Sequence, residues 1–358
     1  MDIETRISII KRKPTSEIVT DDDLKNLLET KQRPVHYIGM EISGLLHIGS
    51  VFMLGYKLRD FLEAGCTAQV YLADWHSIIN NKFGGDWEKI NRASKYYEEM
   101  FKFFAPGVKI VRGSELYHNN DEYWKNVINF CKHVTLARDV RCLEIMGRSQ
   151  KETLDVAKYI YPPMQAVDIR TIGADICHAG MDQRKIHMLA REVYPSMGFE
   201  KPVAVHHALL PGLLEPPKVE ADEGQTDKEA SVAAAKMSKS KPDTSIFLSD
   251  SADIIKKKIS KAYCPPEAEA NPVLALVRHI VFREQKEFTI IRPAKFGGDV
   301  SFQSYEEVEA AYLGKTLHAA DLKSGVAEAM DKAVSPIRSH FEKKPELLEV
   351  FEQAKITR

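Results

Sequence analysis

An imidazole, a bare backbone position and a hydroxyl stand side by side in this chain, where an apolar helix is expected to begin. The stretch is SGLLHIGSVF, and it supplies His47, Gly49 and Ser50. At a helix start, unpaired backbone N–H groups and the helix dipole favour an anion such as phosphate. His47 and Ser50 can donate hydrogen bonds to phosphate oxygens, and Gly49 leaves room for a purine against the backbone. Alone, the stretch fits a structural histidine at a helix start better than a binding site.

A second polar stretch, AAAKMSKSKPD, lies far down the chain. It carries Lys236 and Lys239 together with Ser238 and Ser240. Two lysines on a flexible loop can close over a triphosphate and neutralise the charge that develops as pyrophosphate leaves. The serines add hydroxyl donors. Alone, such a stretch is more typical of a solvated loop, so its interpretation depends on the elements around it.

Those elements alternate between strand and helix. Buried runs of β-branched and aromatic residues predict strands, and apolar residues at three- and four-residue steps predict the helices between them. This order predicts an α/β fold with a Rossmann-like parallel sheet and right-handed crossovers. His47 then follows the first strand, where nucleotides bind open α/β sheets. The predicted strands are residues 35–41, 67–73, 108–113, 174–180 and 202–208, and the main helices are 20–30, 47–64, 87–104 and 181–194.

The remaining regions complete a two-domain organisation. A helical pattern runs from residue 121 to about 149, a helical pair is expected at 153–171, and residues 216–235 have the composition of a mobile loop. One face of the first pattern carries Trp124, Val127, Ile128, Cys131 and Val134. We expect a catalytic domain at 1–235 with a helical insertion at about 115–165, a lysine loop at 236–250, and a C-terminal α-helical domain at 251–358.

Composition narrows the class of protein. The 358 residues carry a formal net charge of −1, so any contact with nucleic acid must depend on local patches. No run of about 18 apolar residues predicts a membrane span, and the first residues lack the apolar core of a signal peptide. Five scattered cysteines form no CxxC pair and no metal-ligand spacing. These features predict a cytoplasmic protein without a membrane partner or a metal site of its own.

The two polar stretches together are far more specific than either one. An HxGx helix start after the first strand, followed by KMSKS after the fifth, resembles the class I aminoacyl-tRNA synthetases. The resemblance implies ATP as a substrate, with Mg²⁺ bound through its phosphates. It implies that three residues are catalytic and also contact ATP: His47, Lys236 and Lys239. It implies three further contacts with ATP, from Gly49, Ser50 and Ser238. The family's stretch usually ends in a second histidine where this chain has Ser50, which leaves the role of that position open.

The middle of the chain points to the amino acid. Tyr161, Gln165 and Asp168 are spaced four and three apart, so they project from one face of a helix. With Tyr37 and Gln183 they resemble the tyrosyl-tRNA synthetases of the archaeal and eukaryotic type, and the resemblance covers nearly the whole chain. It implies that Tyr37 and Asp168 hydrogen-bond the phenol of tyrosine. It also implies that the other three residues hold the α-amino group.

The resemblance further implies the reaction and the partners. L-tyrosine is activated by ATP to tyrosyl-adenylate, and the tyrosyl group then passes to the 3′ end of tRNA(Tyr). Such catalysis depends mostly on positioning and charge stabilisation. The apolar face of residues 124–134 is either core or a dimer interface, and the resemblance favours a homodimer. The implied tRNA contacts are Arg141, Arg184 and Lys185 at the acceptor end, and Phe296, His318 and Asp321 at the anticodon.

Three other interpretations remain open. A tryptophanyl-tRNA synthetase would share both stretches, but an indole N–H does not need the donor and acceptor that Tyr37 and Asp168 provide. A nucleotidyltransferase could use an HxGx stretch without tRNA, but KMSKS and the helical C-terminal region oppose it. A non-catalytic RNA-binding relative is opposed by the intact set of residues from His47 to Lys239.

Overall fold

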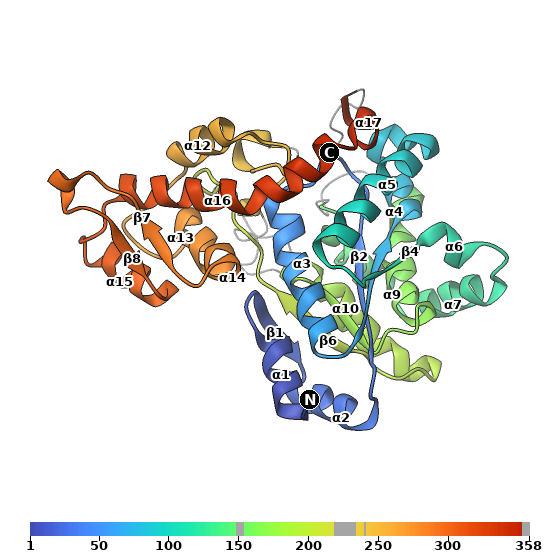
Figure 1. Cartoon of the computed structure of the whole chain (residues 1–358). Helices are drawn as coiled ribbons and strands as arrows, with labels where there is room; N and C mark the ends of the chain where they lie inside the picture. Colours follow the sequence, from blue (N-terminus) through green and yellow to red (C-terminus); the bar gives the residue numbers. More distant parts are fainter. Residues whose placement is uncertain (148–153, 218–233, 240, 353–358) are drawn as a thin grey trace.

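The structure is a computed structural model of the chain, and it describes residues 1–147, 154–217, 234–239 and 241–352 (Figure 1). The side chain of Phe296 is not described. Ser240 and almost all of the loop expected at 216–235 therefore lie outside the described residues.

A six-stranded sheet forms the centre of the first part of the chain. Its order is β1-β6-β5-β2-β3-β4, and all neighbouring strands are parallel except β1 and β6. All five predicted strands are present, and the Rossmann-like α/β fold is confirmed. The strands are β1 (Thr15–Val19), β2 (Val35–Met40), β3 (Thr67–Leu72), β4 (Lys109–Arg112), β5 (Ile176–Gly180) and β6 (Val203–His207).

Helices cover both faces of this sheet. α3 (Ile48–Glu63) and α5 (Trp87–Phe104) belong to the core on one face, while α9 (Tyr161–Thr171) and α10 (Arg184–Val193) belong to the core on the other. Because successive strand residues point to opposite faces, neighbouring positions of β2 serve different cores. The remaining helices of this part are α1 (Ile3–Lys11), α2 (Asp21–Thr30), α4 (Asp74–Ile79), α6 (Gly113–Tyr117), α7 (Asp121–Lys132) and α8 (Leu136–Val140).

The helical pattern at 121–149 is not one helix. α7 ends at its cap His133, and α8 begins after Thr135. The apolar face expected to be core or a dimer interface is divided: Val127 is buried and Trp124 and Val134 pack against the core, whereas Ile128 is 64% exposed. The other buried side chains of α7 are Tyr123 and Phe130, and the helix packs against α9. Ile128 and Cys131 are the members of that face that point outward.

The C-terminal part is mostly helical, as predicted, with one exception. Two short strands, β7 (Phe288–Ile290) and β8 (Val300–Phe302), form an antiparallel hairpin that the sequence did not predict. The long helix α16 (Ala319–Glu342) runs from this group toward α5, where Phe341 meets Tyr96 at a ring separation of 4.9 Å (Figure 1). The other helices are α12 (Ala252–Ser260), α13 (Pro272–Leu276), α14 (Phe282–Glu284), α15 (Tyr305–Leu313) and α17 (Glu349–Glu352). None of the helices in the described ranges is both long and apolar enough to cross a bilayer.

Candidate active site

A cavity of about 560 Å³ opens at the carboxyl ends of the central strands. Every residue that the sequence assigned to tyrosine or ATP lines it, although these residues come from five separate segments of the chain. They are Tyr37, His47, Gly49, Ser50, Tyr161, Gln165, Asp168, Gln183, Lys236, Ser238 and Lys239. The parallel sheet explains this convergence, because the carboxyl ends of its strands meet at one edge.

Asp168 is buried in the wall of the cavity, and its two carboxylate oxygens differ in their hydrogen bonding. One oxygen accepts hydrogen bonds from Tyr117 (2.8 Å) and Tyr123 (3.0 Å). The other oxygen is buried without a hydrogen-bond partner among the described residues, and His76 Nε2 lies 3.7 Å from it. Burial raises the pKa of Asp168 to about 7, although the tyrosine hydroxyls lower it. The second oxygen is therefore an acceptor that a ligand hydroxyl can satisfy.

Two further phenols complete this end of the cavity. Tyr37 is 1% exposed, and burial raises its pKa, so it stays protonated and can donate. A Cβ atom at Gly39 would lie 2.7 Å from the Tyr37 hydroxyl, so this strand position must be glycine. Tyr71 hydrogen-bonds Tyr117. The sequence analysis missed Tyr71, Tyr117 and Tyr123, and the one available signal was that Tyr71 lies near the carboxyl end of a predicted strand.

The amide and phenol side chains expected around the amino group also lie together. Gln165 donates to Gln183 (3.1 Å), and Gln183 donates to the carbonyl of Ile145 (2.9 Å). The neighbouring Glu41, which the sequence analysis did not single out, accepts from Asn80 (2.8 Å). The carboxylate and the linked amides form a polar wall that fits an ammonium group.

The start of α3 is built around His47, which caps the helix. The Ser50 hydroxyl donates to the His47 carbonyl (2.8 Å) and accepts from the His47 backbone N–H (3.2 Å). The donor that was expected to reach phosphate is thus used inside the helix start. Burial, and then the charges of Lys239 and Lys236, lower the pKa of His47 to about 3, so the ring is neutral. A Cβ at Gly49 would meet the His47 ring at 3.1 Å and Met237 at 3.4 Å, so these side chains occupy the space expected for a purine.

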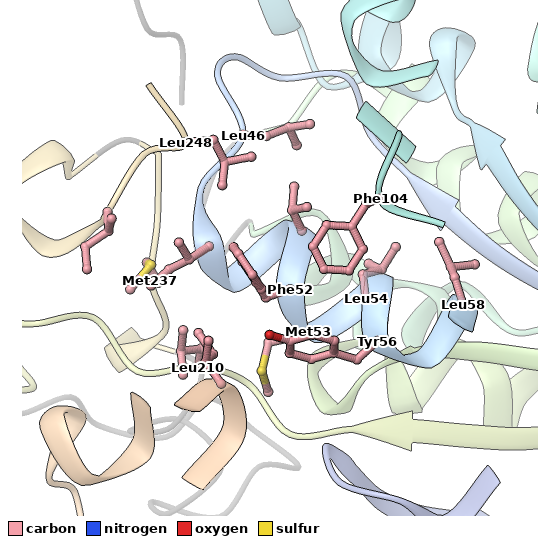
Figure 2. Close-up of a cluster of buried hydrophobic side chains, with 14 of the residues drawn as sticks. Leu46, Phe52, Met53, Leu54, Tyr56, Leu58, Phe104, Leu210, Met237 and Leu248 are labelled. Carbon is pink, nitrogen blue, oxygen red and sulfur yellow. The ribbon is translucent and has the colours of Figure 1, made fainter. Parts of the chain in front are cut away.

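The lysine stretch is docked against this helix start. Ile48 N donates to the carbonyl of Ile246 (3.0 Å), and Leu248 N donates to that of Leu46. Met237 is buried in the same apolar cluster as Leu46, Leu248 and Phe52 (Figure 2). The two polar stretches of the sequence are therefore joined by backbone pairing and by a shared core.

Both lysines already have protein partners. Lys236 contacts Asp182 at 2.6 Å, and the carboxylate charge raises the pKa of this lysine. Lys239 donates to the Tyr97 hydroxyl (2.6 Å) and to Ser43 (3.1 Å). Two ammonium groups thus face the cavity beside α3, on contacts that an incoming phosphate can replace.

The three residues expected to contact the tRNA acceptor end do not belong to the cavity lining, although Gln183, which precedes two of them in the chain, does. Arg184 binds the carboxylate of Glu17 at 2.8 and 3.0 Å, and Lys185 lies 2.6 Å from Glu144. Arg141 is exposed. Exposure leaves Arg141 available to phosphate, whereas Arg184 and Lys185 must first exchange a protein carboxylate.

The three anticodon candidates lie around the start of α16 and the β7–β8 hairpin. Asp321 is in the first turn of α16, 3.8 Å from the guanidinium of Arg292. His318 caps the helix by accepting from the N–H of Ala320 (3.2 Å). His318 therefore has a structural role, while Asp321 is partly exposed beside a loop.

Known proteins resemble the chain along its whole length. Residues 29–335 match the family of class I tRNA synthetases for tryptophan and tyrosine. The tyrosine--tRNA ligases of Thermococcus sibiricus and Pyrococcus abyssi are 47% and 46% identical, over the full length of both chains. A solved tyrosyl-tRNA synthetase from Pyrococcus horikoshii, complexed with L-tyrosine, is 44% identical, with a TM-score of 0.91 over 99% of this chain and 100% of that chain. The Plasmodium falciparum tryptophanyl-tRNA synthetase is 16% identical and shares the fold alone. The chain therefore belongs to the class I tRNA synthetases of the tryptophan and tyrosine family, and within it to the tyrosine--tRNA ligases.

Proposed function

We propose that the cavity is where L-tyrosine and ATP react, with the phenol at Asp168 and the triphosphate at the lysine stretch. The observation that carries this proposal is the unsatisfied buried oxygen of Asp168. A phenol hydroxyl can donate to it, while Tyr37 supplies a second hydrogen bond to the same hydroxyl. Phenylalanine in the same place leaves the carboxylate oxygen buried and unpaired, which costs about 1–3 kcal/mol or more.

The rest of the tyrosine molecule then faces the polar wall. Its α-amino group lies against Tyr161, Gln165 and Gln183, with the carboxylate of Glu41 nearby. The tyrosine carboxylate is left pointing toward the helix start at His47. In tyrosine the amino group and the carboxylate are both bonded to Cα, so a Cα beside the polar wall lets the carboxylate turn toward His47.

In the first step, a carboxylate oxygen of tyrosine attacks the α-phosphorus of ATP. A new C–O–P linkage forms, the bond to the β-phosphate oxygen breaks, and pyrophosphate leaves with its electron pair. The nucleophile is already ionised, so no protein base is needed. Lys236 and Lys239 neutralise the departing charge, and the neutral His47 donates an N–H to a phosphate oxygen. Both lysines exchange their present protein partners for phosphate.

Mg²⁺ fits this site through ATP and not through a protein cage. The cavity carboxylates Glu41 and Asp182 have protein partners. Within the described ranges, no group of three or more His, Cys, Asp or Glu side chains is placed to hold a metal ion. Such a donor set suits an ion that is bound by phosphate oxygens and water, where it supplies positive charge to the triphosphate.

In the second step, the terminal ribose hydroxyl of tRNA(Tyr) attacks the tyrosyl carbonyl carbon and AMP leaves. The tRNA acceptor end approaches near Arg141, Arg184 and Lys185, and the anticodon lies by Asp321 and the loop that carries Phe296. We also propose a homodimer that covers the outward apolar side chains of α7 and α8. Ile128 is 64% exposed and Leu136 is 68% exposed, which is unusual for large apolar groups that are close in sequence.

One experiment tests the central proposal. The exchange of labelled pyrophosphate into ATP is measured in the presence of each of the twenty amino acids in turn. Tyrosine alone should support rapid exchange. Comparable exchange with tryptophan or phenylalanine would contradict the proposal that Asp168 and Tyr37 select tyrosine by hydrogen-bonding its phenol hydroxyl.

A further inference from the structure

Three buried histidines form a hydrogen-bonded row that the proposed reaction does not use. His36 on β2, His178 on β5 and His207 on β6 lie on neighbouring strands. His36 Nε2 lies 3.1 Å from His178 Nδ1, and His178 Nε2 lies 2.8 Å from His207 Nδ1. His36 and His178 are fully buried, whereas His207 is 5% exposed and lines the cavity. The row therefore leads from the core of the protein into the cavity wall.

All three imidazoles are neutral at physiological pH. Burial lowers the pKa of His36 to about 3 and that of His207 to about 4, and it lowers the pKa of His178 well below its usual value. A neutral imidazole has one N–H donor and one acceptor nitrogen. In a row joined by two hydrogen bonds, every ring must then point its N–H in the same direction along the row. The tautomer of one ring consequently sets the tautomers of the other two.

The buried end of the row favours one direction. His36 Nδ1 is buried and has no hydrogen-bond partner within the described part of the chain. If the N–H groups pointed toward His36, this nitrogen would carry a buried donor without an acceptor. Buried N–H groups without partners are rarer than unsatisfied acceptors. The N–H groups therefore point from His36 toward His207.

The cavity end favours the same direction. Asp182 lines the cavity beside His207. Burial raises the pKa of Asp182, but the charge and hydrogen bond of Lys236 outweigh it and the pKa is lowered, so the carboxylate is ionised. A lone pair on His207 Nε2 would be repelled by this negative charge, whereas an N–H is attracted. Both ends thus place a proton on Nε2 of His207.

The cavity reaches this part of the sheet edge, because Gly180, Asp182 and His207 all line it. Gly180 keeps Asp182 close to His207: a Cβ atom there would lie 2.6 Å from Asp182 Oδ1, 2.7 Å from Leu209 Cδ2 and 3.6 Å from His207 Nε2, so a side chain would displace the carboxylate. Lys236, which contacts Asp182, lies at the same wall.

We propose that the histidine row fixes His207 as its Nε2–H tautomer, so that His207 donates a hydrogen bond to an acceptor atom of the bound nucleotide. His207 is then a nucleotide-binding residue, and His36 and His178 are positioning residues that act through it. The inference rests on the proposed function, because it takes ATP to lie beside Lys236.

The tautomers can be measured directly on the unaltered protein. In protein labelled with ¹⁵N-histidine, two-bond ¹H–¹⁵N correlations distinguish a protonated Nε2 from a protonated Nδ1. We expect Nε2–H at all three rings, and loss of one ring's signals in His207→Leu identifies His207. A protonated Nδ1 at His207 would overturn the proposal. This measurement does not need activity, and folded His207→Leu serves only to assign the signals of His207.

Kinetics test whether the nucleotide uses the donor. His207→Leu should raise the KM for ATP in pyrophosphate exchange by roughly threefold to tenfold, which is the loss of one neutral hydrogen bond. The KM for tyrosine should not change, because the phenol and amine contacts are elsewhere. His207→Gln, whose amide N–H can reach the position of Nε2, should recover most of the affinity. An unchanged KM for ATP in a folded His207→Leu enzyme would refute the role, while tyrosine-dependent exchange by the wild type tests the proposed function separately.

A remote variant with a matched control tests the row. His36→Leu removes the first donor without touching the cavity, and it should raise the KM for ATP in the same direction as His207→Leu but by less. The control is His187→Leu: His187 is equally buried and pairs with His206 (3.0 Å) on the other face of the sheet. It should lower the thermal unfolding midpoint and leave the KM for ATP unchanged. If both variants raise the KM for ATP equally, the effect is general destabilisation and the row does not position His207.

Discussion

At the scale of single residues, the site depends on polar atoms that are buried before any substrate arrives. Asp168 keeps one oxygen for the tyrosines of the protein and leaves the other without a partner among the described residues. Leaving a buried acceptor unsatisfied costs stability, and a ligand that satisfies it recovers that cost as binding energy. Selectivity for a hydroxyl and reduced stability of the free enzyme thus have one origin.

The first prediction concerns selectivity. Asp168→Ala should raise the KM for tyrosine by roughly tenfold to a hundredfold, the range for losing a hydrogen bond to a charged group. It should also reduce discrimination against phenylalanine. The KM for ATP should change little, and exchange kinetics measure all three quantities. Unaltered selectivity in the variant would contradict the assignment of Asp168.

The second prediction concerns pH. Because burial raises the pKa of Asp168 to about 7, the folded protein holds this proton over a range in which the unfolded chain has lost it. The contribution of Asp168 to stability therefore falls as pH rises from about 4 to about 7. Asp168→Asn does not titrate, so its free energy of unfolding should rise relative to wild type over that range. Denaturant unfolding at pH 5, 6, 7 and 8 measures the difference, and a constant difference would mean that the pKa is not raised.

At the scale of elements, the start of α3 and the lysine stretch behave as one unit. Backbone pairing between residues 246–248 and 46–48 and the burial of Met237 hold the stretch against the helix. The lysine side chains can change partners because their contacts lie at the cavity surface: Lys239 donates to the Tyr97 hydroxyl, and Lys236 pairs with the carboxylate of Asp182. The backbone is thus positioned in advance, and in the proposed complex only the lysine side chains change partners to meet the triphosphate.

The third prediction tests this unit. Lys239→Ala should lower the single-turnover rate of adenylate formation by roughly 10²-fold or more, the scale of losing a preorganised stabilising donor. Equilibrium binding of tyrosine should be unchanged. Lys241→Ala is the matched control, because Lys241 is an exposed lysine two positions further on, and its rate should equal that of wild type. Equal rates for both variants would exclude Lys239 from the reaction.

At the scale of the whole molecule, two regions of the described surface away from the cavity are proposed to contact partners. Ile128 on α7 and Leu136 on α8 are large apolar side chains that are exposed, which suits contact with a second copy of the chain more than with RNA. The start of α16 and the neighbouring hairpin are polar and lie far along the chain from the cavity residues (Figure 1). A carboxylate there, such as Asp321, can accept hydrogen bonds from a guanine edge.

The fourth prediction concerns assembly. Leu136→Glu places a charge at one of these exposed apolar positions and should convert a dimer into monomers, which sedimentation velocity measures directly. Ile254→Glu is the control, because Ile254 is also exposed (43%) but lies on α12 in the C-terminal part. It should leave the dimer intact. A wild-type monomer at micromolar concentration would refute the interface.

The fifth prediction separates the two ends of the tRNA. Asp321→Ala should impair the tyrosylation of tRNA while leaving tyrosine-dependent pyrophosphate exchange intact, because adenylate formation needs no tRNA. Changing the first anticodon base should then cost the variant less than it costs wild type. Fully additive losses would mean that Asp321 does not read that base and only pairs with Arg292.

Local sequence patterns were enough to predict the alternation of strands and helices, the position of His47 after a strand, and the common face of Tyr161, Gln165 and Asp168. These features follow from local periodicity, which a single stretch of chain carries. Tertiary structure decided the rest. β1 is a short polar strand that exists because β6 offers an edge, and which side chains of α7 are buried depends on its packing against α9. Likewise, no local pattern could show that Tyr117 and Tyr123 share an oxygen of Asp168, or that His36, His178 and His207 form one row. Such contacts join residues that are far apart in sequence, and only the strand order and the packing of the helices bring them together.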